Sequence, residues 1–211
     1  MPFSSRQEAG QLLGQHIGER ETGIDLVLGL ARGGVVVAAE VARVLQSPFD
    51  VMIVRKIGHP QFREFAVGAL GEADVVVLDE PVLRRSHIDK ADLDAVIAEE
   101  NGRLLAYHNR FARPDRPVRE GKSIAIVDDG LATGATLEAA VHSARKQRAR
   151  RILVAVPVAS NTGARRIGRI CDTFYALIID PTFQAVGAYY ESFAQTTDEE
   201  VLAILKAKTG G

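Results

Sequence analysis

The sequence predicts an α/β fold in which helices flank a parallel, twisted sheet. Short runs rich in β-branched residues alternate with longer segments of helical periodicity along most of the 211 residues. Several of these runs are apolar at consecutive positions, which is typical of strands covered by helices on both faces. A chain of this length can bury one full core, so we expect a single domain over residues 1–211.

The apolar runs are predicted to be central strands of this sheet. They cover residues 26–30, 51–54, 75–78, 124–127, 152–156 and 174–179. Two segments that directly follow strands carry small or apolar residues at helical spacing, as the crossover helices of βαβ units do. These predicted crossover helices cover residues 34–45 and 136–148.

Helix start signals stand near both ends of the chain. Ser5 with Glu8, and Thr197 with Glu200, have the spacing of capping boxes. We therefore expect an N-terminal and a C-terminal helix, both packed on the domain.

The span 58–121 interrupts the alternation of strands and helices. It holds a polar loop at 59–63, one strand candidate, a long charged helix at 89–107 and a turn-rich stretch at 113–117. We expect it to form a small insertion beside the sheet, with an exposed histidine, His59, in its loop.

The composition excludes several classes of function. Lys and Arg number 26 against 27 Asp and Glu, so no overall charge attracts nucleic acid or an anionic membrane. The basic stretch 145–151 is expected to be a solvated helix end. No run reaches the roughly 18 apolar residues of a membrane span, and the N-terminus lacks the pattern of a leader. The single cysteine, Cys171, fits a buried residue in a reducing compartment. We expect a cytoplasmic protein.

The strongest chemical signal is an apolar strand that ends in Asp128 and Asp129 and continues as a small-residue loop to Thr136. Backbone N–H groups and hydroxyls at the start of a helix favour a phosphate, and Gly134 permits close approach. Two adjacent carboxylates would repel that phosphate, so they must face sugar hydroxyls, a metal, or both. A phosphorylated ribose combines these features. The Walker A and G-x-G-x-x-G patterns are absent.

Two further strand ends carry charges or glycines that suit a second phosphate group. Arg32 and the glycines beside it follow the strand at 26–30, and backbone N–H groups with a guanidinium can bind an anion there. Arg55 and Lys56 follow the run 51–54. If the sheet is parallel, these loops converge with the loop at 128–136 on one edge. The alternative for Arg55 and Lys56 is a pair of solvated surface cations.

The segment 124–136 resembles the signature of the type I phosphoribosyltransferases. That resemblance implies that Asp128 and Asp129 bind the ribose of 5-phosphoribosyl 1-pyrophosphate (PRPP). It also implies that the 5-phosphate is bound by Ala132, Thr133, Gly134, Ala135 and Thr136. The pyrophosphate would be bound by Ala31, Arg32 and Gly33, near a cis peptide at 31–32, with Lys56 favoured over Arg55. Mg²⁺ would be held mainly through PRPP, and by Asp128 or Asp129 through water.

The C-terminal segment 180–211 resembles the part of these enzymes that contributes to the acceptor site, where an aromatic residue stacks on a purine. The resemblance implies that Phe183 and Val158 lie at that site. Phe183 could equally fill a gap beneath the last helix. Ala132 stands where oxopurine enzymes have an acidic residue, and the segment 156–158 stands where they have a lysine, which argues against oxopurine specificity.

The whole chain looks like a group of bacterial phosphoribosyltransferases whose acceptor is unassigned. The expected reaction transfers a 5-phosphoribosyl group from PRPP to a nitrogen nucleophile, and the loop at 59–63 resembles the mobile active-site loop of the family. A non-catalytic regulator that binds PRPP or a nucleotide is the alternative, and hydrolysis is a third hypothesis. A small-molecule acceptor and a homodimer are the expected partners.

Overall fold

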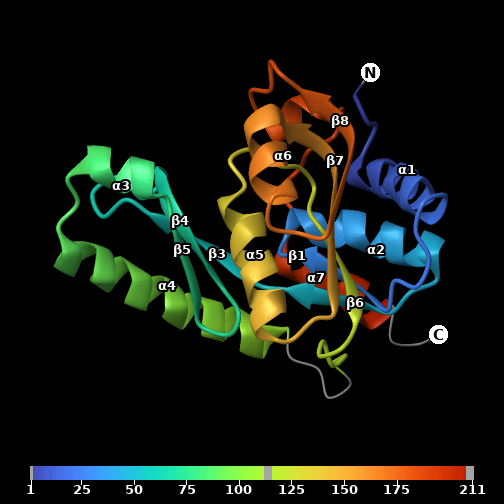
Figure 1. The fold of residues 1–211 in the computed structure, drawn as a ribbon, viewed down its shortest axis with the longest axis horizontal. Helices are drawn as coiled ribbons and strands as arrows, with labels where there is room; N and C mark the ends of the chain where they lie inside the picture. The colour runs from blue at the N-terminus through green and yellow to red at the C-terminus, as the bar shows by residue number, and fades with distance from the viewer. Residues whose placement is uncertain (1, 112–115, 208–211) are drawn as a thin grey trace.

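The strands separate into two sheets in the computed structural model, which describes residues 2–111 and 116–207 (Figure 1). The main sheet has five parallel strands in the order β2-β1-β6-β7-β8, which confirms the predicted α/β class. Its strands are β1 (Leu26–Leu30), β2 (Phe49–Met52), β6 (Ser123–Val127), β7 (Arg151–Ser160) and β8 (Thr173–Asp180). The runs 51–54 and 174–179 were expected at the centre of the sheet, but β2 and β8 lie at its edges.

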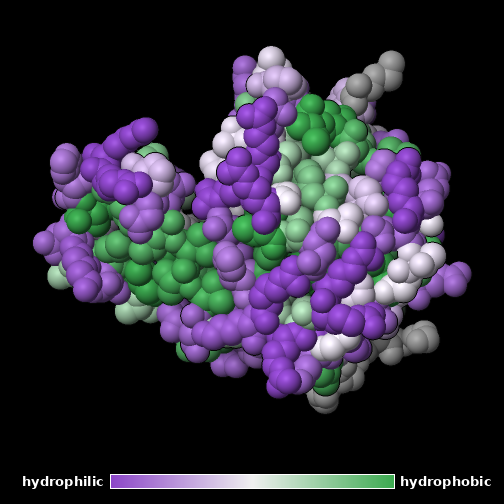
Figure 2. Space-filling model, in the orientation of Figure 1, coloured by the Kyte–Doolittle hydropathy of each residue, from purple (hydrophilic) through white to green (hydrophobic). Residues whose placement is uncertain are grey.

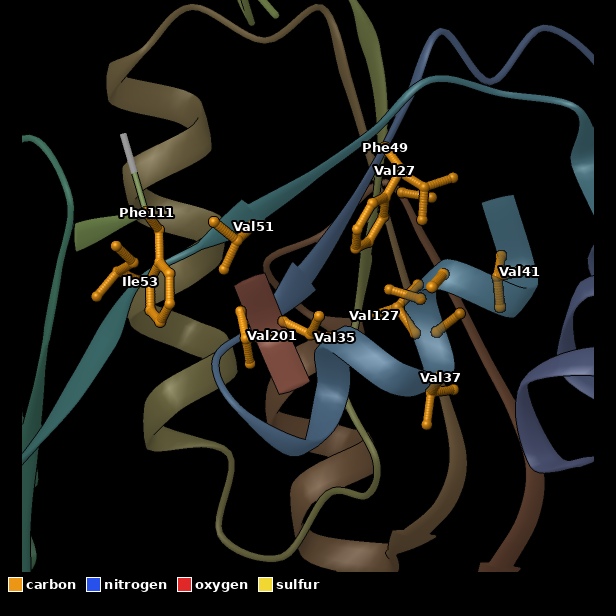
Figure 3. Close-up of a cluster of buried hydrophobic side chains, with 14 of the residues drawn as sticks. Val27, Val35, Val37, Val41, Phe49, Val51, Ile53, Phe111, Val127 and Val201 are labelled. Atoms are coloured by element: carbon orange, nitrogen blue, oxygen red, sulfur yellow. The ribbon is translucent and has the colours of Figure 1, made fainter. Parts of the chain in front are cut away.

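Helices cover both faces of the main sheet. One face carries α1 (Arg6–Gly18), α2 (Gly33–Leu45) and α7 (Asp198–Ala207), and the other carries α5 (Ala135–Lys146) and α6 (Asn161–Gly168). Because successive side chains of a strand point to opposite faces, Val27 joins the first core and Leu26 the second. Figure 3 shows Val27 and Val127 beside the side chains of α2, with Val201 of α7 close by.

The capping signals at both ends of the chain are confirmed. Ser5 Oγ accepts a hydrogen bond from Glu8 N and so caps α1, but the Glu8 carboxylate accepts from Ser4 N rather than Ser5 N, so this box is not reciprocal. Thr197 and Glu200 form the reciprocal pair, each accepting on its side chain from the backbone N–H of the other. Each pair satisfies N–H groups that the first turn of a helix leaves without partners.

The insertion forms a second lobe around an antiparallel sheet in the order β3-β4-β5. Its elements are β3 (Val54–Gly58), β4 (Ala66–Gly71), β5 (Val75–Leu78), α3 (Glu80–Ser86) and α4 (Lys90–Arg110). Two expectations are thereby corrected. The run 51–54 is divided between β2 and β3, and the run 75–78 belongs to this sheet rather than the parallel one. The turn expected at 113–117 lies partly outside the described residues.

Strand β4 was not predicted because its small residues do not have the composition typical of a strand. Two of its glycines stand where neighbours come very close. A Cβ atom on Gly68 would lie 2.3 Å from the Val77 carbonyl oxygen, and one on Gly71 would lie 2.2 Å from Ser143 Oγ of α5. The small side chains therefore let this strand pack tightly against β5 and α5.

A network of buried charges joins the two lobes, and we call Asp50, Glu72, Arg116 and Arg119 the hinge cluster. Arg116 donates to Asp50 Oδ2 at 2.9 Å and to Glu72 Oε1 at 2.9 Å. Arg119 donates to Glu72 Oε2 at 2.5 Å. Glu72 also accepts from the backbone N–H of Ile53, between β2 and β3. The cluster thus fixes the chain where it passes from one sheet to the other.

The basic stretch 145–151, which was expected to be a solvated helix end, runs from the end of α5 to the start of β7. The arginines of this stretch pair with acids from other segments: Arg145 with Asp172, Arg148 with Glu120, Arg150 with Asp25 and Arg151 with Glu21. None of the described helices is both long and apolar enough to cross a membrane. Figure 2 shows hydrophobic residues gathered over the second sheet, where Val76 of β5 is 47% exposed.

Candidate functional site

The loops after β1 and β6 lie together because these strands are paired in parallel. Gly29 of β1 is the register partner of Val127 of β6, so both chains leave the sheet at the same edge. A cavity of about 270 Å³ opens there. The predicted site residues that line it are Ala31, Arg32, Gly33, Lys56, Asp128, Asp129, Ala132, Thr133, Gly134 and Thr136.

The loop after β6 is fastened to the end of β7. Leu131 N donates to Val158 O, and Ser160 N donates to Leu131 O, both at 2.8 Å. Ser160 Oγ donates to the Ala132 carbonyl oxygen at 2.6 Å. Gly134 then turns the chain into α5 with a φ of 89°, which a side chain would disfavour. These bonds hold the loop in one shape, with the start of α5 directed toward the cavity.

The two carboxylates lie directly against the glycines of the neighbouring loop. A Cβ atom on Gly33 would lie 2.1 Å from Asp129 Oδ2, and one on Gly34 would lie 2.7 Å from Asp128 Oδ1. The sequence suggested that this glycine pair binds an anion through its N–H groups. The contacts show a further role, since only glycine leaves room for the acidic pair.

The acidic pair is incompletely neutralised. Burial raises the pKa of Asp128 well above its ordinary value, and the neighbouring Asp129 carboxylate adds to this rise. Burial also raises the pKa of Asp129, although Arg6 and Lys56 oppose the rise. Perturbed carboxyl groups that line a cavity are typical of functional sites. A ligand that brings hydroxyl donors or a cation would stabilise their ionised forms.

Arg6, the first residue of α1, was not predicted to belong to the site, yet its side chain contacts the acidic pair. Its Nε donates to Asp129 Oδ2 at 2.8 Å, and its Nη1 donates to Ala194 O at 2.8 Å. Its guanidinium carbon lies 3.9 Å from the centre of the Phe193 ring. Tyr190 OH donates to the Asp129 carbonyl oxygen at 2.6 Å. The N-terminal helix and the C-terminal segment therefore meet at one carboxylate.

A signal for Arg6 was present in the sequence. The buried face of α1 follows helical spacing and begins with this arginine: Arg6, Ala9, Gly10, Leu13, Gly14 and Ile17. A charge on an apolar stripe implies a buried partner, because an unpaired charge is costly to bury. The spacing could thus have identified Arg6, but not the aspartate 123 residues away that it contacts.

The predicted pyrophosphate loop has a cis peptide bond between Ala31 and Arg32, as expected. Arg32 Nη1 lies 3.5 Å from Asp198 Oδ1 of α7. Lys56 is exposed and makes no ion pair with any described residue. Its ammonium group is therefore free to contact a ligand at the cavity.

Arg55 and Lys56 reach the site by a different route from the one predicted. Both stand within β3 of the antiparallel sheet, rather than after a strand of the parallel one. Their side chains alternate, so only Lys56 lines the small cavity. Arg55 pairs with Glu100 of α4 at 3.0 Å and lies over the Tyr107 ring.

A larger cavity of about 800 Å³ adjoins the small one and shares Arg32, Lys56 and Thr136 with it. Its far wall comes from the second lobe, where Arg63 pairs with Glu99 at 2.8 Å. The expectation of an exposed histidine in the nearby loop is wrong. His59 is only 9% exposed, since it packs against aromatic side chains of its own loop.

The two residues predicted at an acceptor site lie in different environments. Phe183 is partly exposed and stacks on Tyr189, with ring centres 5.5 Å apart. Val158 is fully buried, and its carbonyl oxygen accepts the bond from the loop described above. Nearby, Val186 lies very close to Gly130: a Cβ atom on Gly130 would lie 2.5 Å from Cγ1 of Val186. Phe183 and Val158 do not line the small cavity, whereas Val186 does.

The family model and the curated relatives that match this chain indicate the same family. The phosphoribosyl transferase domain family matches residues 4–191. A Mycobacterium tuberculosis protein named "Putative phosphoribosyl transferase" is 43% identical over 204 residues. The match covers 96% of this chain and 46% of that protein, so the chain spans about half the length of the curated relatives it matches.

Solved structures share the fold. The crystal structure of TT1426 from Thermus thermophilus is 42% identical, with a TM-score of 0.78, and the match covers 97% of this chain and 98% of that one. A hypothetical protein from Neisseria gonorrhoeae, solved with bound ppGpp, has a TM-score of 0.54 at 14% identity, and 98% of each chain is covered. This second likeness shows the fold alone.

Proposed function

Because the chain belongs to the phosphoribosyltransferase family, we propose that it transfers a 5-phosphoribosyl group from PRPP to a nitrogen nucleophile and releases pyrophosphate. One observation carries the proposal. The acidic pair, the helix-start loop and Lys56 surround the same cavity of about 270 Å³. This combination suits a ligand with a phosphate, a diol and a second anionic group.

The 5-phosphate is assigned to residues 132–136. Backbone N–H groups at the start of α5 and the Thr133 and Thr136 hydroxyls offer donors, and the helix dipole favours negative charge. The ribose hydroxyls are assigned to Asp128 and Asp129. Donation from these hydroxyls would offset part of the cost of burying the two carboxylates.

Arg32 and Lys56 are assigned to the pyrophosphate, because both line the cavity and carry positive charge. Gly33 and Ala31 would supply backbone contacts. Arg55 is assigned a weaker role at this anion, since its guanidinium pairs with Glu100. Asp128 and Asp129 also provide oxygen atoms, the ligand type that Mg²⁺ prefers, and they fit an ion held through PRPP and water. When bound, Mg²⁺ would neutralise charge that develops on the pyrophosphate.

In the proposed reaction, a nitrogen lone pair forms a bond to C1 of the ribose as the C1–O bond to pyrophosphate breaks. The electron pair of that bond leaves with the pyrophosphate oxygen, and the nitrogen then loses a proton to water. The chain's contribution is to align the ribose and to stabilise the leaving charge. Phe183 is proposed to border the acceptor site, and Val158, which is fully buried, to contribute only by holding the neighbouring loop through its carbonyl oxygen. The identity of the acceptor is left to the screen below.

The test is isothermal titration of the protein with PRPP, with and without Mg²⁺, followed by a screen for pyrophosphate release with purine, pyrimidine and amine acceptors. We expect Mg²⁺-dependent binding and release with at least one acceptor. If the protein binds PRPP but releases pyrophosphate with none of the acceptors, the result would favour the non-catalytic regulator. Release without an acceptor would favour hydrolysis, and no binding at all would overturn the proposal.

Two further expectations, a cytoplasmic location and a homodimer, accompany this proposal. The dimer is tested by sedimentation equilibrium on the 22.8 kDa chain, which would show twice that mass.

A further inference from the structure

We propose that Arg6 is a positioning residue that holds the Asp129 carboxylate in the orientation needed to accept a hydrogen bond from the ribose. The inference rests on the proposed function, because it concerns the same ribose site. It goes further by assigning a role to the N-terminal helix and to the C-terminal segment around Phe193. Neither element belongs to the loops that surround the small cavity.

Arg6 is held by three interactions at once. Its side chain is 10% exposed and bonds to Asp129 Oδ2 and Ala194 O, both at 2.8 Å, while its guanidinium lies against the Phe193 ring. A guanidinium is planar and offers several donors in a rigid fork, so two hydrogen bonds and a ring contact define its orientation. A side chain fixed in this way can fix the carboxylate it contacts.

The arrangement divides the two oxygen atoms of Asp129 between structure and ligand. Oδ2 accepts from Arg6 and lies against the Gly33 backbone. No side chain among the described residues donates a hydrogen bond to Oδ1. The backbone of the same residue is also held, since Tyr190 OH donates to its carbonyl oxygen. Oδ1 is thereby left as the atom that can receive a ribose hydroxyl.

Arg6 also lines the larger cavity, together with Arg32 and Lys56, so direct contact with a bound anion is the competing role. Two observations favour positioning. The Nε and Nη1 donors of Arg6 are already occupied, and the Phe193 ring covers its guanidinium. Arg32 and Lys56 have no comparable hydrogen bonds from the described residues, so they are better placed to serve as the anion ligands.

The experiment is a double-mutant cycle on the affinity for PRPP with Mg²⁺, using Arg6→Gln, Asp129→Asn and the combined variant. We expect Arg6→Gln to weaken PRPP binding by about tenfold to a hundredfold, the range for a lost hydrogen bond to a charged group. In the Asp129→Asn background, Arg6→Gln should add little, because the carboxylate that it positions is gone. Arg6→Lys should restore part of the affinity, since lysine can keep one ion pair but not the fork.

The readout that separates the two roles is affinity for inorganic pyrophosphate, which lacks the ribose. A positioning role leaves pyrophosphate affinity unchanged in Arg6→Gln, whereas direct anion binding lowers it and overturns the proposal. Arg151→Gln is the matched control. It removes another arginine–carboxylate pair, with Glu21 just after α1, away from the cavity, and should leave PRPP affinity unchanged.

The outcomes distinguish this proposal from the proposed function. If the wild type binds PRPP and Arg6→Gln binds it equally well, the positioning role is wrong and the function stands. Additive effects in the cycle would likewise overturn the positioning role and leave the function standing. If the wild type does not bind PRPP, both are wrong.

Discussion

Two clusters of charge, each containing carboxylates whose ionisation burial opposes, differ in whether those carboxylates are neutralised. The hinge cluster contains Asp50, Glu72, Arg116 and Arg119, and what we call the site cluster contains Asp128, Asp129, Arg6 and Lys56. Each has two carboxylates and two cations. Burial opposes ionisation of Glu72, yet its two arginines hold its pKa below the ordinary value of 4.5. In the site cluster burial prevails, and the pKa of both aspartates is raised.

The difference lies in distance and geometry. Glu72 receives hydrogen bonds from both arginines, at 2.9 and 2.5 Å, and a third from a backbone N–H. Asp128 receives one backbone hydrogen bond and none from a cation, while Lys56 acts on it only through longer-range attraction. When a cluster completes its own pairing, removal of one partner leaves a buried charge uncompensated and destabilises the fold. One that leaves carboxylates short of partners has capacity for a ligand.

The largest expected effect is on the site cluster. Asp128→Asn combined with Asp129→Asn should abolish PRPP binding, because the ribose hydroxyls lose both charged acceptors. The same variant should keep at least wild-type stability at neutral pH, since burial of the two charges is unfavourable. Titration calorimetry and urea unfolding measure the two quantities. Retained affinity, or a lowered free energy of unfolding, would show that the pair serves the fold instead.

The hinge cluster should respond in the opposite way. Glu72→Gln leaves Arg116 and Arg119 without their shared carboxylate, and loss of one partner of a buried pair costs about 3 to 5 kcal/mol. We expect this loss in the free energy of unfolding in urea. PRPP affinity, measured well below the unfolding transition, should change far less than in the aspartate variant. A loss below about 1 kcal/mol in the free energy of unfolding, which is typical of an exposed ion pair, would contradict the assignment of a structural role to this cluster.

The two cations of β3 provide a matched pair within the second lobe. Lys56→Ala should lower turnover about a hundredfold, as loss of one charge-stabilising donor does. Arg55→Ala should lower it much less, because that guanidinium pairs with Glu100 and has only a weaker role at the pyrophosphate. Steady-state pyrophosphate release compares them. Equal losses would mean that Arg55 changes partners when the ligand binds.

The smallest effect is in the pH dependence of stability, and its sign differs between the clusters. A lowered pKa means that folded Glu72 binds fewer protons than unfolded Glu72, so its contribution is present above pH 4.5 and is lost as the pH falls through the folded value. The deficit of Glu72→Gln should therefore shrink in acid. Asp128 has a raised pKa, so its cost to stability begins as the pH rises above the ordinary value of 3.8 and is complete above the raised value. Asp128→Asn should be more stable than the wild type at neutral pH, and this gain should vanish in acid. Urea unfolding between about pH 3 and pH 7 tests both signs. If both variants were less stable, or both more stable, than the wild type at neutral pH, the two clusters would not differ as described.

Much of the site was predictable because its residues are neighbours in the chain. The loop from Asp128 to Thr136 follows a strand and opens a helix, so its position and its turn at Gly134 follow from local sequence, although bonds to β7 hold its shape. Lys56 was found for a partly wrong reason, since it lies in β3 and not at an end of the parallel sheet. Arg6 was missed because its partner lies 123 residues away.

The sequence alone determined the class of fold, both terminal caps and the loop at 128–136, because periodicity, capping and strand-to-helix turns are governed by residues a few positions apart. Tertiary structure alone decided that residues 51–54 divide between two sheets and that Arg6 meets Asp129. It also decided which cluster of charges is neutralised. These outcomes depend on distances between segments far apart in the chain, and the energy of a buried charge depends on those distances.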